Sequence, residues 1–445
     1  MPMPDIGKLN TVIRKPLFKI FLIGLVLRIV LMPLFGYPYD TMHWALAIQH
    51  IQAGAGLYDI DGYYYTPTWG YILGIWSHVF DLFGVTNYGQ LFDSTLPLEH
   101  AYSNYLATLT TVSFNFIIKI PFLISDIIVG YLIYKIIYEK TNDEKKATLG
   151  FTLWFLCPLT IFVSAVHGMF DSISVMFMLL SVYSLRKGRD ILAGISMAVA
   201  ITLKIFPIIA VFALIMYLAA KHKGDSRTIF KRLLTVAVSL SLMTLILFIP
   251  QILDGTVMNS LLFFTSRSSS VGGGGGGGWS LSSVVFLLPI IAVVLSPIIA
   301  FWLYKKRDAD KVAEECFFSS LMLSFAIAVL IPSSPQYALF MIPFLIFFVV
   351  IFDKRFMKPF ILLSVTLVIY AIMIPHLTLL FSLAAYTNLL DLGHVYSLAE
   401  WMNATLFGVP RASILAGIFQ AGAIISMILI FWYWVRYRRE GSKDV

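Results

Sequence analysis

Long apolar stretches separated by short polar segments run through most of the chain. A helix needs about 20 apolar residues to cross a bilayer, and many of these stretches approach that length. The stretch at 191–220 is longer and is interrupted by Lys204 and Pro207, so it predicts two short helices that meet at the outer side. The other predicted spans are 17–35, 112–138, 148–165, 173–185, 233–250, 281–304, 314–331, 337–352, 359–375 and 413–435. The pattern predicts an all-α, polytopic membrane protein with about twelve transmembrane helices.

The distribution of charge supports this topology, with both ends of the chain in the cytoplasm. Of the 32 Lys and Arg residues, 27 lie in the predicted cytoplasmic segments or at the cytoplasmic ends of the adjoining spans, as the positive-inside rule requires, whereas seven of the eight His residues lie on the predicted outer side. The other five cations are Arg28, Lys119, Lys204, Arg267 and Arg411. A charge in the hydrocarbon core costs ~2.5–3.5 kcal/mol, so such groups should pair or face a cavity. Lys119 and Asp126, seven residues apart, are expected to share an inward helix face.

Two outer loops interrupt the apolar pattern of what we predict to be a single integral membrane domain, 1–445. The first loop, 36–111, carries an expected interfacial helix at 40–51 and a more apolar piece at 63–82. That second piece either spans the membrane or lies in the interface, and the parity of the later spans favours the interface. The second loop, 251–280, contains seven consecutive glycines and lacks the GK[ST] ending of a nucleotide-binding loop.

Composition excludes a soluble protein and changes the meaning of the positive charge. The chain is 59% hydrophobic and 13% charged, too few charges to cover a soluble core of 445 residues. A net charge of +8 in a soluble protein would raise nucleic-acid binding, but here the cations are topology signals, and no nucleic-acid partner is expected. Both Cys residues lie at or within spans, which indicates neither a disulfide framework nor a metal motif.

Acidic residues of the first outer loop are the first candidates for chemistry. Asp40 directly follows the first span, at the depth of the lipid headgroups. Partial desolvation there raises the pKa of a carboxyl group toward that of a general base, although an ordinary loop aspartate is the alternative. Asp59 and Asp61 have a spacing that can offer oxygen ligands to Mg or Mn, but such acidic pairs also occur in loops by chance.

A short outer turn at 167–172 and a few outer cations complete the set of candidates. His167 and Asp171 flank Gly168, where backbone can approach a ligand closely, although Asp171 could equally cap the following helix. Arg267, Arg411 and Lys204 are the cations on the outer side that could hold a phosphate, and arginine offers a planar fork suited to phosphate oxygens.

Short motifs in a fixed order on the outer side carry a resemblance to a known class. They are Tyr39-Asp40, Gly56-Leu57-Tyr58-Asp59, Tyr64-Tyr65-Thr66-Pro67, His167-Gly168-Met169-Phe170-Asp171-Ser172, Leu203-Lys204-Ile205-Phe206-Pro207, Arg267 before Trp279-Ser280, and Pro335-Gln336-Tyr337. Through about residue 345, the chain resembles the GT-C class of membrane glycosyltransferases, in particular the mannosyltransferases that use polyprenyl-phosphate mannose. The polyglycine run departs from that pattern.

The resemblance implies a reaction and roles for individual residues. Asp40 would deprotonate the acceptor hydroxyl for an inverting attack on the anomeric carbon, while Arg267 and Lys204 would hold the donor phosphate. The expected substrate-binding residues are His43, His167, Asp171, Tyr65 and Gln336. The partners would be a polyprenyl-phosphate sugar, membrane lipids and a glycan, lipid or protein acceptor.

The sequence also suggests a cellular location and leaves two other functions to consider. The carboxyl terminus, Gly-Ser-Lys-Asp-Val, carries no retention motif, which favours a prokaryotic plasma membrane with the site on its outer face. A transporter or flippase for lipid-linked sugars would also have many spans, but it would tend to show internal repeats, and none is convincing. A glycan polymerase or ligase stays open, because it shares the same lipid-phosphate chemistry.

Overall fold

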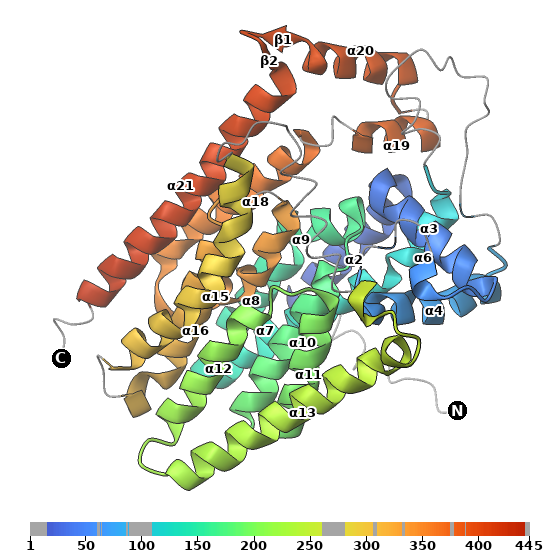
Figure 1. Cartoon of the computed structure of the whole chain (residues 1–445). Helices are drawn as coiled ribbons and strands as arrows, with labels where there is room; N and C mark the ends of the chain where they lie inside the picture. The colour runs from blue at the N-terminus through green and yellow to red at the C-terminus, as the bar shows by residue number, and fades with distance from the viewer. Residues whose placement is uncertain are drawn as a thin grey trace, which may run out of the picture.

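The structure, a computed structural model, is a bundle of long helices capped on one side by shorter ones (Figure 1). It describes residues 16–59, 63, 65–85, 88, 109–259, 281–305, 309–331, 334–373, 378–387 and 389–440. Within these residues, the only strands are the paired β1 (Thr405–Leu406) and β2 (Val409–Pro410). The all-α class expected from the sequence is confirmed.

Six helical stretches in the described residues are long and apolar enough to cross a membrane. They are α2 (Pro16–Leu34), Val112–Thr141, which comprises α6 (Val112–Ile118) and α7 (Ile120–Thr141), α13 (Ser226–Leu253), Leu287–Lys305 within α15 (Leu281–Lys305), Lys354–Met373, which ends in α18 (Met357–Met373), and α21 (Arg411–Glu440). The bent pair Glu144–Phe155 and Pro158–His167 would make a seventh. The polytopic membrane architecture is therefore also confirmed.

The remaining predicted spans, together with the one that falls on this bent pair, also lie on helices, which are shorter or carry more charge. These are α8 (Glu144–Phe155), α9 (Pro158–Ile161) with η2 (Phe162–His167), α10 (Asp171–Arg186), α11 (Asp190–Leu203), α12 (Ile208–Lys221), α16 (Ala309–Ala328), and η3 (Pro335–Phe340) with α17 (Ile342–Phe347) and η4 (Phe348–Phe352). The expected break at 204–207 is present, because α11 ends before Lys204, whose backbone is extended, and α12 begins after Pro207. This break places Lys204 between α11 and α12, where we predicted an outer turn.

A buried ion pair joins the first of these stretches, α2, to the second, in α7. Arg28 of α2 donates from Nε to Asp126 Oδ2 of α7 over 2.9 Å and from Nη1 to the Phe155 carbonyl over 2.7 Å. Ser164 donates to the same Asp126 oxygen over 2.6 Å. The partner of Asp126 is therefore Arg28. Lys119, which we expected on the same face, bonds instead to backbone carbonyls.

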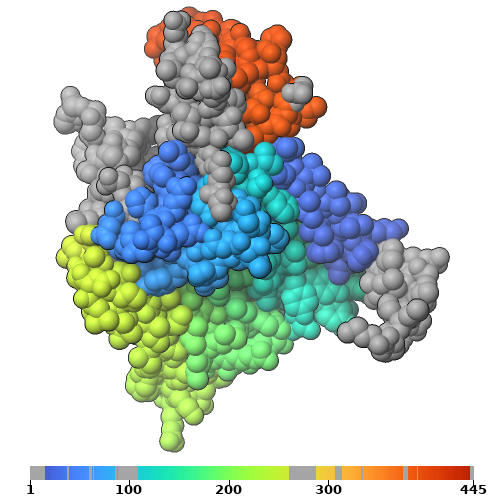
Figure 2. Space-filling model, turned by 90° about the vertical axis from the view of Figure 1, so that its right-hand side faces the viewer, coloured from blue at the N-terminus to red at the C-terminus, as the bar shows by residue number. Residues whose placement is uncertain are grey.

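Two shorter helices of the first outer loop, α3 (Pro38–Gln52) and α4 (Pro67–Leu82), lie across one end of the bundle. They are at the right of Figure 1 and cover the centre of the face shown in Figure 2. Each begins with a proline at its first turn, a position that needs no N–H partner. Both starts are joined by a hydrogen bond from Tyr65 to Asp40, and both ends by one from Gln52 to Asp81, so the helices run parallel.

Hydrogen bonds fix α4 to the transmembrane helices beneath it. The Tyr71 hydroxyl lies 2.9 Å from the Leu247 carbonyl and 2.8 Å from Gln251 Oε1 of α13, and these two acceptors share its single hydrogen. The Trp76 indole donates to the Ile117 carbonyl of α6 over 2.8 Å. With 16 residues, α4 is not among the helices that are long and apolar enough to cross a membrane. These bonds give the first loop a fixed position over the bundle.

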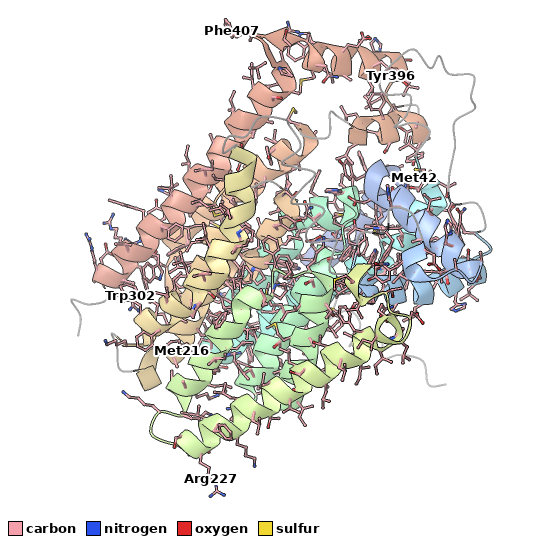
Figure 3. The ribbon with its side chains drawn as sticks, in the orientation of Figure 1. Met42, Met216, Arg227, Trp302, Tyr396 and Phe407 are labelled. Atoms are coloured by element: carbon pink, nitrogen blue, oxygen red, sulfur yellow. The ribbon has the colours of Figure 1, made fainter. Side chains whose placement is uncertain are left out.

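A second group of short elements, in a predicted outer loop, precedes the last span. It consists of α19 (Thr378–Tyr386), α20 (Leu392–Asn403) and the β1–β2 hairpin, at the top of Figure 1. The hairpin turns at Phe407 and Gly408, both with positive φ, and leads directly into α21. Figure 3 labels Phe407 at the tip, far from Arg227, which lies in a predicted cytoplasmic segment at the opposite end of the molecule.

Candidate active site

Asp40 lies in the first turn of α3, on the side of the bundle opposite the predicted cytoplasmic turns. Met42, two residues further along α3, marks this end in Figure 3, whereas Met216 and Arg227 mark the other end. The Tyr65 hydroxyl donates to Asp40 Oδ1 over 2.9 Å, and His167 Nε2 lies 3.5 Å from Asp40 Oδ2. The Asp40 side chain is 15% exposed, so it is accessible but held by neighbours from two other segments.

The pKa of Asp40 is shifted in the direction opposite to our expectation. Burial acts to raise the pKa of this carboxyl group, but His167, the hydrogen bond from Tyr65 and the charge of Lys204 together lower it below its usual value. These partners come from segments 25 or more positions away, so the expectation from desolvation alone was wrong. The consequence is a carboxylate that stays ionised over a wide pH range.

The turn that carries His167 is fixed to the end of the first span. The Tyr37 backbone N–H donates to the His167 carbonyl over 3.3 Å, and the Tyr37 and His167 rings meet edge to face at 4.8 Å. Gly168 has a φ of +81°, and a Cβ there would lie 2.6 Å from Lys119 Cε. The turn therefore requires glycine at this position both for its backbone conformation and for space.

Lys119 explains why this turn and the end of α2 stay together. It is fully buried, and its ammonium donates to the carbonyls of Met32 and Ala165, each over 3.0 Å, and to those of Phe35 and Val166. Two chain segments whose helices end here thus share one cation as a cap for their free carbonyls. Lys119 has a structural role next to the candidate site.

A second ion pair lies beside Asp40. Lys204 Nζ is 3.4 Å from Asp171 Oδ2, and Asp171 is completely buried at the start of α10. The same ammonium lies 4.4 Å from the centre of the Phe170 ring and within 6 Å of the Tyr65 and Tyr337 rings. Cation–π contacts of this kind stabilise a partly desolvated ammonium. The Lys204 side chain keeps 11% of its surface exposed.

Gln336 brings a polar group from a distant part of the chain to the same region. It lies in η3, next to Tyr337, whose ring stacks on Phe206 at 4.4 Å and approaches Lys204. The residue is 7% exposed, and its Oε1 has no hydrogen-bond partner among the described residues. A buried amide oxygen without a partner is costly in a closed core and is understandable where a ligand binds.

The remaining residues that the sequence suggested for substrate, metal or phosphate binding lie in different surroundings. His43 is half-buried on α3, one turn after Asp40. Asp59 is exposed, and its carboxylate accepts the Gly56 N–H over 3.0 Å. Asp61 and Arg267 lie outside the described residues. No group of three or more metal-ligating side chains occurs in the part of the chain that the structure describes, and the Mg or Mn site stays a prediction.

Sequence reasoning missed the aromatic surroundings of the site. Phe170 stacks on Trp69 at 4.3 Å and lies under Lys204, and Trp69 also contacts Trp44 edge to face. Phe170 and Tyr337 stand inside the motifs that carried the resemblance, and their positions next to Asp171 and Gln336 were the available signal. The rings exclude water from one side of the site and so strengthen its electrostatic interactions.

The arrangement as a whole can accept a proton and hold polar groups. It combines an ionised carboxylate that accepts a hydrogen bond from Tyr65 and lies 3.5 Å from His167, a second carboxylate paired with an ammonium, and an amide oxygen without a partner among the described residues. These groups come from five segments that are far apart in sequence, and they meet at the end of the bundle that we predict to face outward. A hydroxyl group placed next to Asp40 would find a proton acceptor there.

Comparisons with known proteins agree with this picture. Residues 87–270 match the family described as GPI transamidase subunit PIG-U. GPI mannosyltransferase 1 of Candida albicans is 32% identical over 105 residues, which are 23% of this chain and 26% of that protein. GPI mannosyltransferase 1 of Saccharomyces cerevisiae is 30% identical over 123 residues, or 27% and 30% of the two chains. The chain thus matches less than a third of either relative.

These matches confirm the resemblance to GT-C class membrane glycosyltransferases. The PIG-U match covers only part of the site. His167, Asp171 and Lys204 lie within the matched residues, whereas Asp40 and Tyr65 precede them. Both named relatives come from eukaryotes, so the comparisons give no support to the expected prokaryotic plasma membrane. An integral membrane protein remains the conclusion on localisation.

Proposed function

We propose that this protein is an inverting glycosyltransferase that moves a hexose from a polyprenyl-phosphate donor to a lipid-linked, glycan or protein acceptor. The observation that carries the proposal is the Asp40 carboxylate, held by Tyr65 and His167 at the outer end of the bundle beside the Lys204–Asp171 pair. Mannose is the favoured sugar, because both named relatives are mannosyltransferases. The reaction takes place at the non-cytoplasmic face of the membrane.

The reaction is a single displacement in which Asp40 takes up the acceptor proton. The acceptor oxygen forms a bond to the anomeric carbon as the bond from that carbon to the phosphate oxygen breaks, and the polyprenyl phosphate leaves. Tyr65 and His167 hold the carboxylate in one orientation toward the incoming hydroxyl. Because its pKa is lowered, Asp40 acts mainly as the acceptor oxygen becomes more acidic in the transition state.

The departing phosphate gains negative charge and needs a nearby cation. Lys204 supplies one, and Arg267 is the second candidate by resemblance. Asp171 holds the Lys204 ammonium next to the site, at 3.4 Å, so the ammonium does not have to move far to meet the phosphate. His43 and Gln336 are left to contact the hydroxyl groups of the substrates.

The family match supports a second function of a different class. The matched family is described as a transamidase subunit, and Asp40 lies outside the matched residues. In this alternative the chain is a subunit of a membrane complex and does not transfer sugar itself. Sugar transfer by the purified chain distinguishes the two functions, because only the glycosyltransferase would catalyse it.

The test uses purified full-length protein in lipid nanodiscs. Labelled polyprenyl-phosphate mannose and polyprenyl-phosphate glucose are supplied with a membrane extract as the source of acceptor, and nucleotide-linked mannose serves as the comparison donor. The proposal predicts labelled product together with stoichiometric polyprenyl phosphate from the lipid-linked donor alone. Absence of transfer from every polyprenyl-phosphate sugar would contradict it and favour the subunit or transporter function.

A further inference from the structure

A cavity of about 490 Å³ lies at the other end of the α3–α4 pair, away from Asp40. Its walls come from the ends of both helices and from one residue of the following segment: Ile51, Gln52, Ser77, His78, Asp81 and Tyr88. The volume falls within the range of about 300–1,000 Å³ that is typical of small-molecule sites. The proposed function uses none of these side chains.

The polar groups of this cavity are already ordered by hydrogen bonds. Gln52 Nε2 donates to Asp81 Oδ1 over 2.8 Å, and the Tyr88 hydroxyl donates to Gln52 Oε1 over 3.1 Å. This chain of bonds connects three segments and fixes an amide beside a carboxylate. Among the described residues, no hydrogen bond to Asp81 Oδ2 or to the His78 ring is present, so both can bind a ligand without breaking the chain.

The charge of the lining selects the chemistry of the occupant. None of the six lining residues is Lys or Arg, and Asp81 is a carboxylate, so the cavity repels a phosphate. A carboxylate and an amide oxygen accept hydrogen bonds from hydroxyl groups, while the amide N–H, the imidazole and the Ser77 hydroxyl can offer donors. A neutral ligand with several hydroxyl groups matches this set, and a saccharide is such a ligand.

The position of the cavity relates it to the proposed reaction. Gln52 follows Asp40 by twelve residues on one helix, which corresponds to about 18 Å. A single sugar cannot contact both places, but an extended chain of several sugars can. We propose that this cavity, the α3–α4 end site, binds a remote unit of an oligosaccharide acceptor whose reacting hydroxyl lies at Asp40. This inference rests on the proposed function.

Binding is measured first, because it does not depend on transfer. Full-length protein in nanodiscs is titrated by calorimetry with linear mannotetraose, with mannose and with inorganic phosphate. Asp81→Asn keeps an acceptor for Gln52 and removes only the charge, and Asp254→Asn, at an exposed aspartate of the second outer loop, is the matched control. We expect mannotetraose affinity to fall about tenfold in Asp81→Asn and to be unchanged in the control, with no phosphate binding at the cavity.

A second variant, His78→Ala, tests the same cavity in case Asp81→Asn disturbs the fold. His78 is exposed and has no part in the Gln52–Asp81 bond, so His78→Ala leaves that bond intact and should also weaken mannotetraose binding. Unchanged mannotetraose affinity in both variants, or competition by inorganic phosphate, would overturn the inference. A native protein that binds mannotetraose through Asp81 but transfers no sugar would refute the proposed function alone.

Transfer then separates a remote subsite from a structural role. With a long oligosaccharide acceptor, Asp81→Asn should raise KM about tenfold and leave kcat near the native value, since the reacting groups are untouched. With a monosaccharide acceptor, which cannot span both places, the variant should match the native protein. An equal loss of kcat with both acceptors would show that Asp81 supports the fold of α4 and binds no substrate.

Discussion

Two buried aspartates, each beside a cation, have opposite characters in this protein. Asp126 Oδ2 accepts hydrogen bonds from Arg28 and Ser164 at 2.9 and 2.6 Å, and the Arg28 and Asp126 side chains are 0% and 1% exposed. Asp171 has only Lys204, at 3.4 Å, and neither of its oxygens makes a closer hydrogen bond among the described residues. The Lys204 side chain is partly exposed, whereas the Arg28 side chain is completely buried.

The difference indicates which pair serves the fold and which serves a reaction. In the inner pair, Arg28–Asp126, the guanidinium also donates to the Phe155 carbonyl and lies over the Phe155 ring, so three helices are tied together. In the outer pair, Lys204–Asp171, both Asp171 oxygens lack a hydrogen bond among the described residues, whereas in Asp126 only Oδ1 does, and this leaves room for a substrate group to bind. The outer pair also adjoins Asp40, the proposed base, whose pKa Lys204 helps to lower.

Breaking the inner pair from one side should have the largest effect. Arg28→Met leaves Asp126 buried without its cation, and the loss of one partner of such a pair costs about 3–5 kcal/mol. We expect a much lower unfolding temperature and little folded protein after extraction, measured by fluorescence-detected thermal unfolding. A variant with native thermal stability would show that the inner pair does not support the fold.

Replacing both members of each pair sharpens the comparison. Lys204→Met with Asp171→Leu should reduce transfer about 10²- to 10³-fold, because the cation for the leaving phosphate is lost, while apolar replacement of both partners keeps the unfolding temperature close to native. Arg28→Met with Asp126→Leu is the matched control and should keep transfer within a few-fold of native. Equal activities in the two double variants would remove the distinction between the pairs.

Tyr65→Phe should have a smaller effect that depends on pH. The Tyr65 hydroxyl stabilises ionised Asp40, so its removal raises the pKa of Asp40. The base must be ionised to accept a proton, and the acidic limb of the profile of kcat/KM against pH should therefore move to higher pH. Transfer at neutral pH should fall only modestly. A limb that stays in place, or moves to lower pH, would argue against Asp40 as the titrating base.

Gln336→Leu should have the smallest effect of the set. The substitution removes a buried amide oxygen that has no partner in the described residues, so the loss is that of one hydrogen bond to substrate, about 0.5–1.5 kcal/mol. KM should rise a few-fold while thermal stability stays the same or increases. A marked loss of stability would instead assign Gln336 to packing, and unchanged kinetics would remove it from the site.

The sequence predicted the fold well, because apolar length and charge distribution are local properties. The break at Lys204 and Pro207 and the helix at 40–51 were both visible as interruptions of an apolar pattern. The partners of each buried charge were not visible. Arg28 and Asp126 are 98 positions apart, and Lys119 bonds to backbone carbonyls that no side-chain pattern records.

The site was predicted in part and for an identifiable reason. Motif resemblance selected Asp40, Tyr65, His167 and Asp171, which the fold brings together. The direction of the pKa shift of Asp40 was predicted wrongly, because it depends on groups 25 and more positions away that approach only in the folded protein. The Gln52–Asp81 bond at the α3–α4 end site also depends on how two helices are placed side by side.

The most direct test of the proposal is single-turnover transfer by Asp40→Asn with donor already bound. The amide can keep the hydrogen bond from Tyr65 but cannot accept the acceptor proton at neutral pH. Asp254→Asn, at an exposed outer position, serves as the control. The account predicts unchanged donor binding and a rate about 10²- to 10⁴-fold below native in Asp40→Asn, with a native rate in the control. Native-like transfer by Asp40→Asn would contradict the central claim.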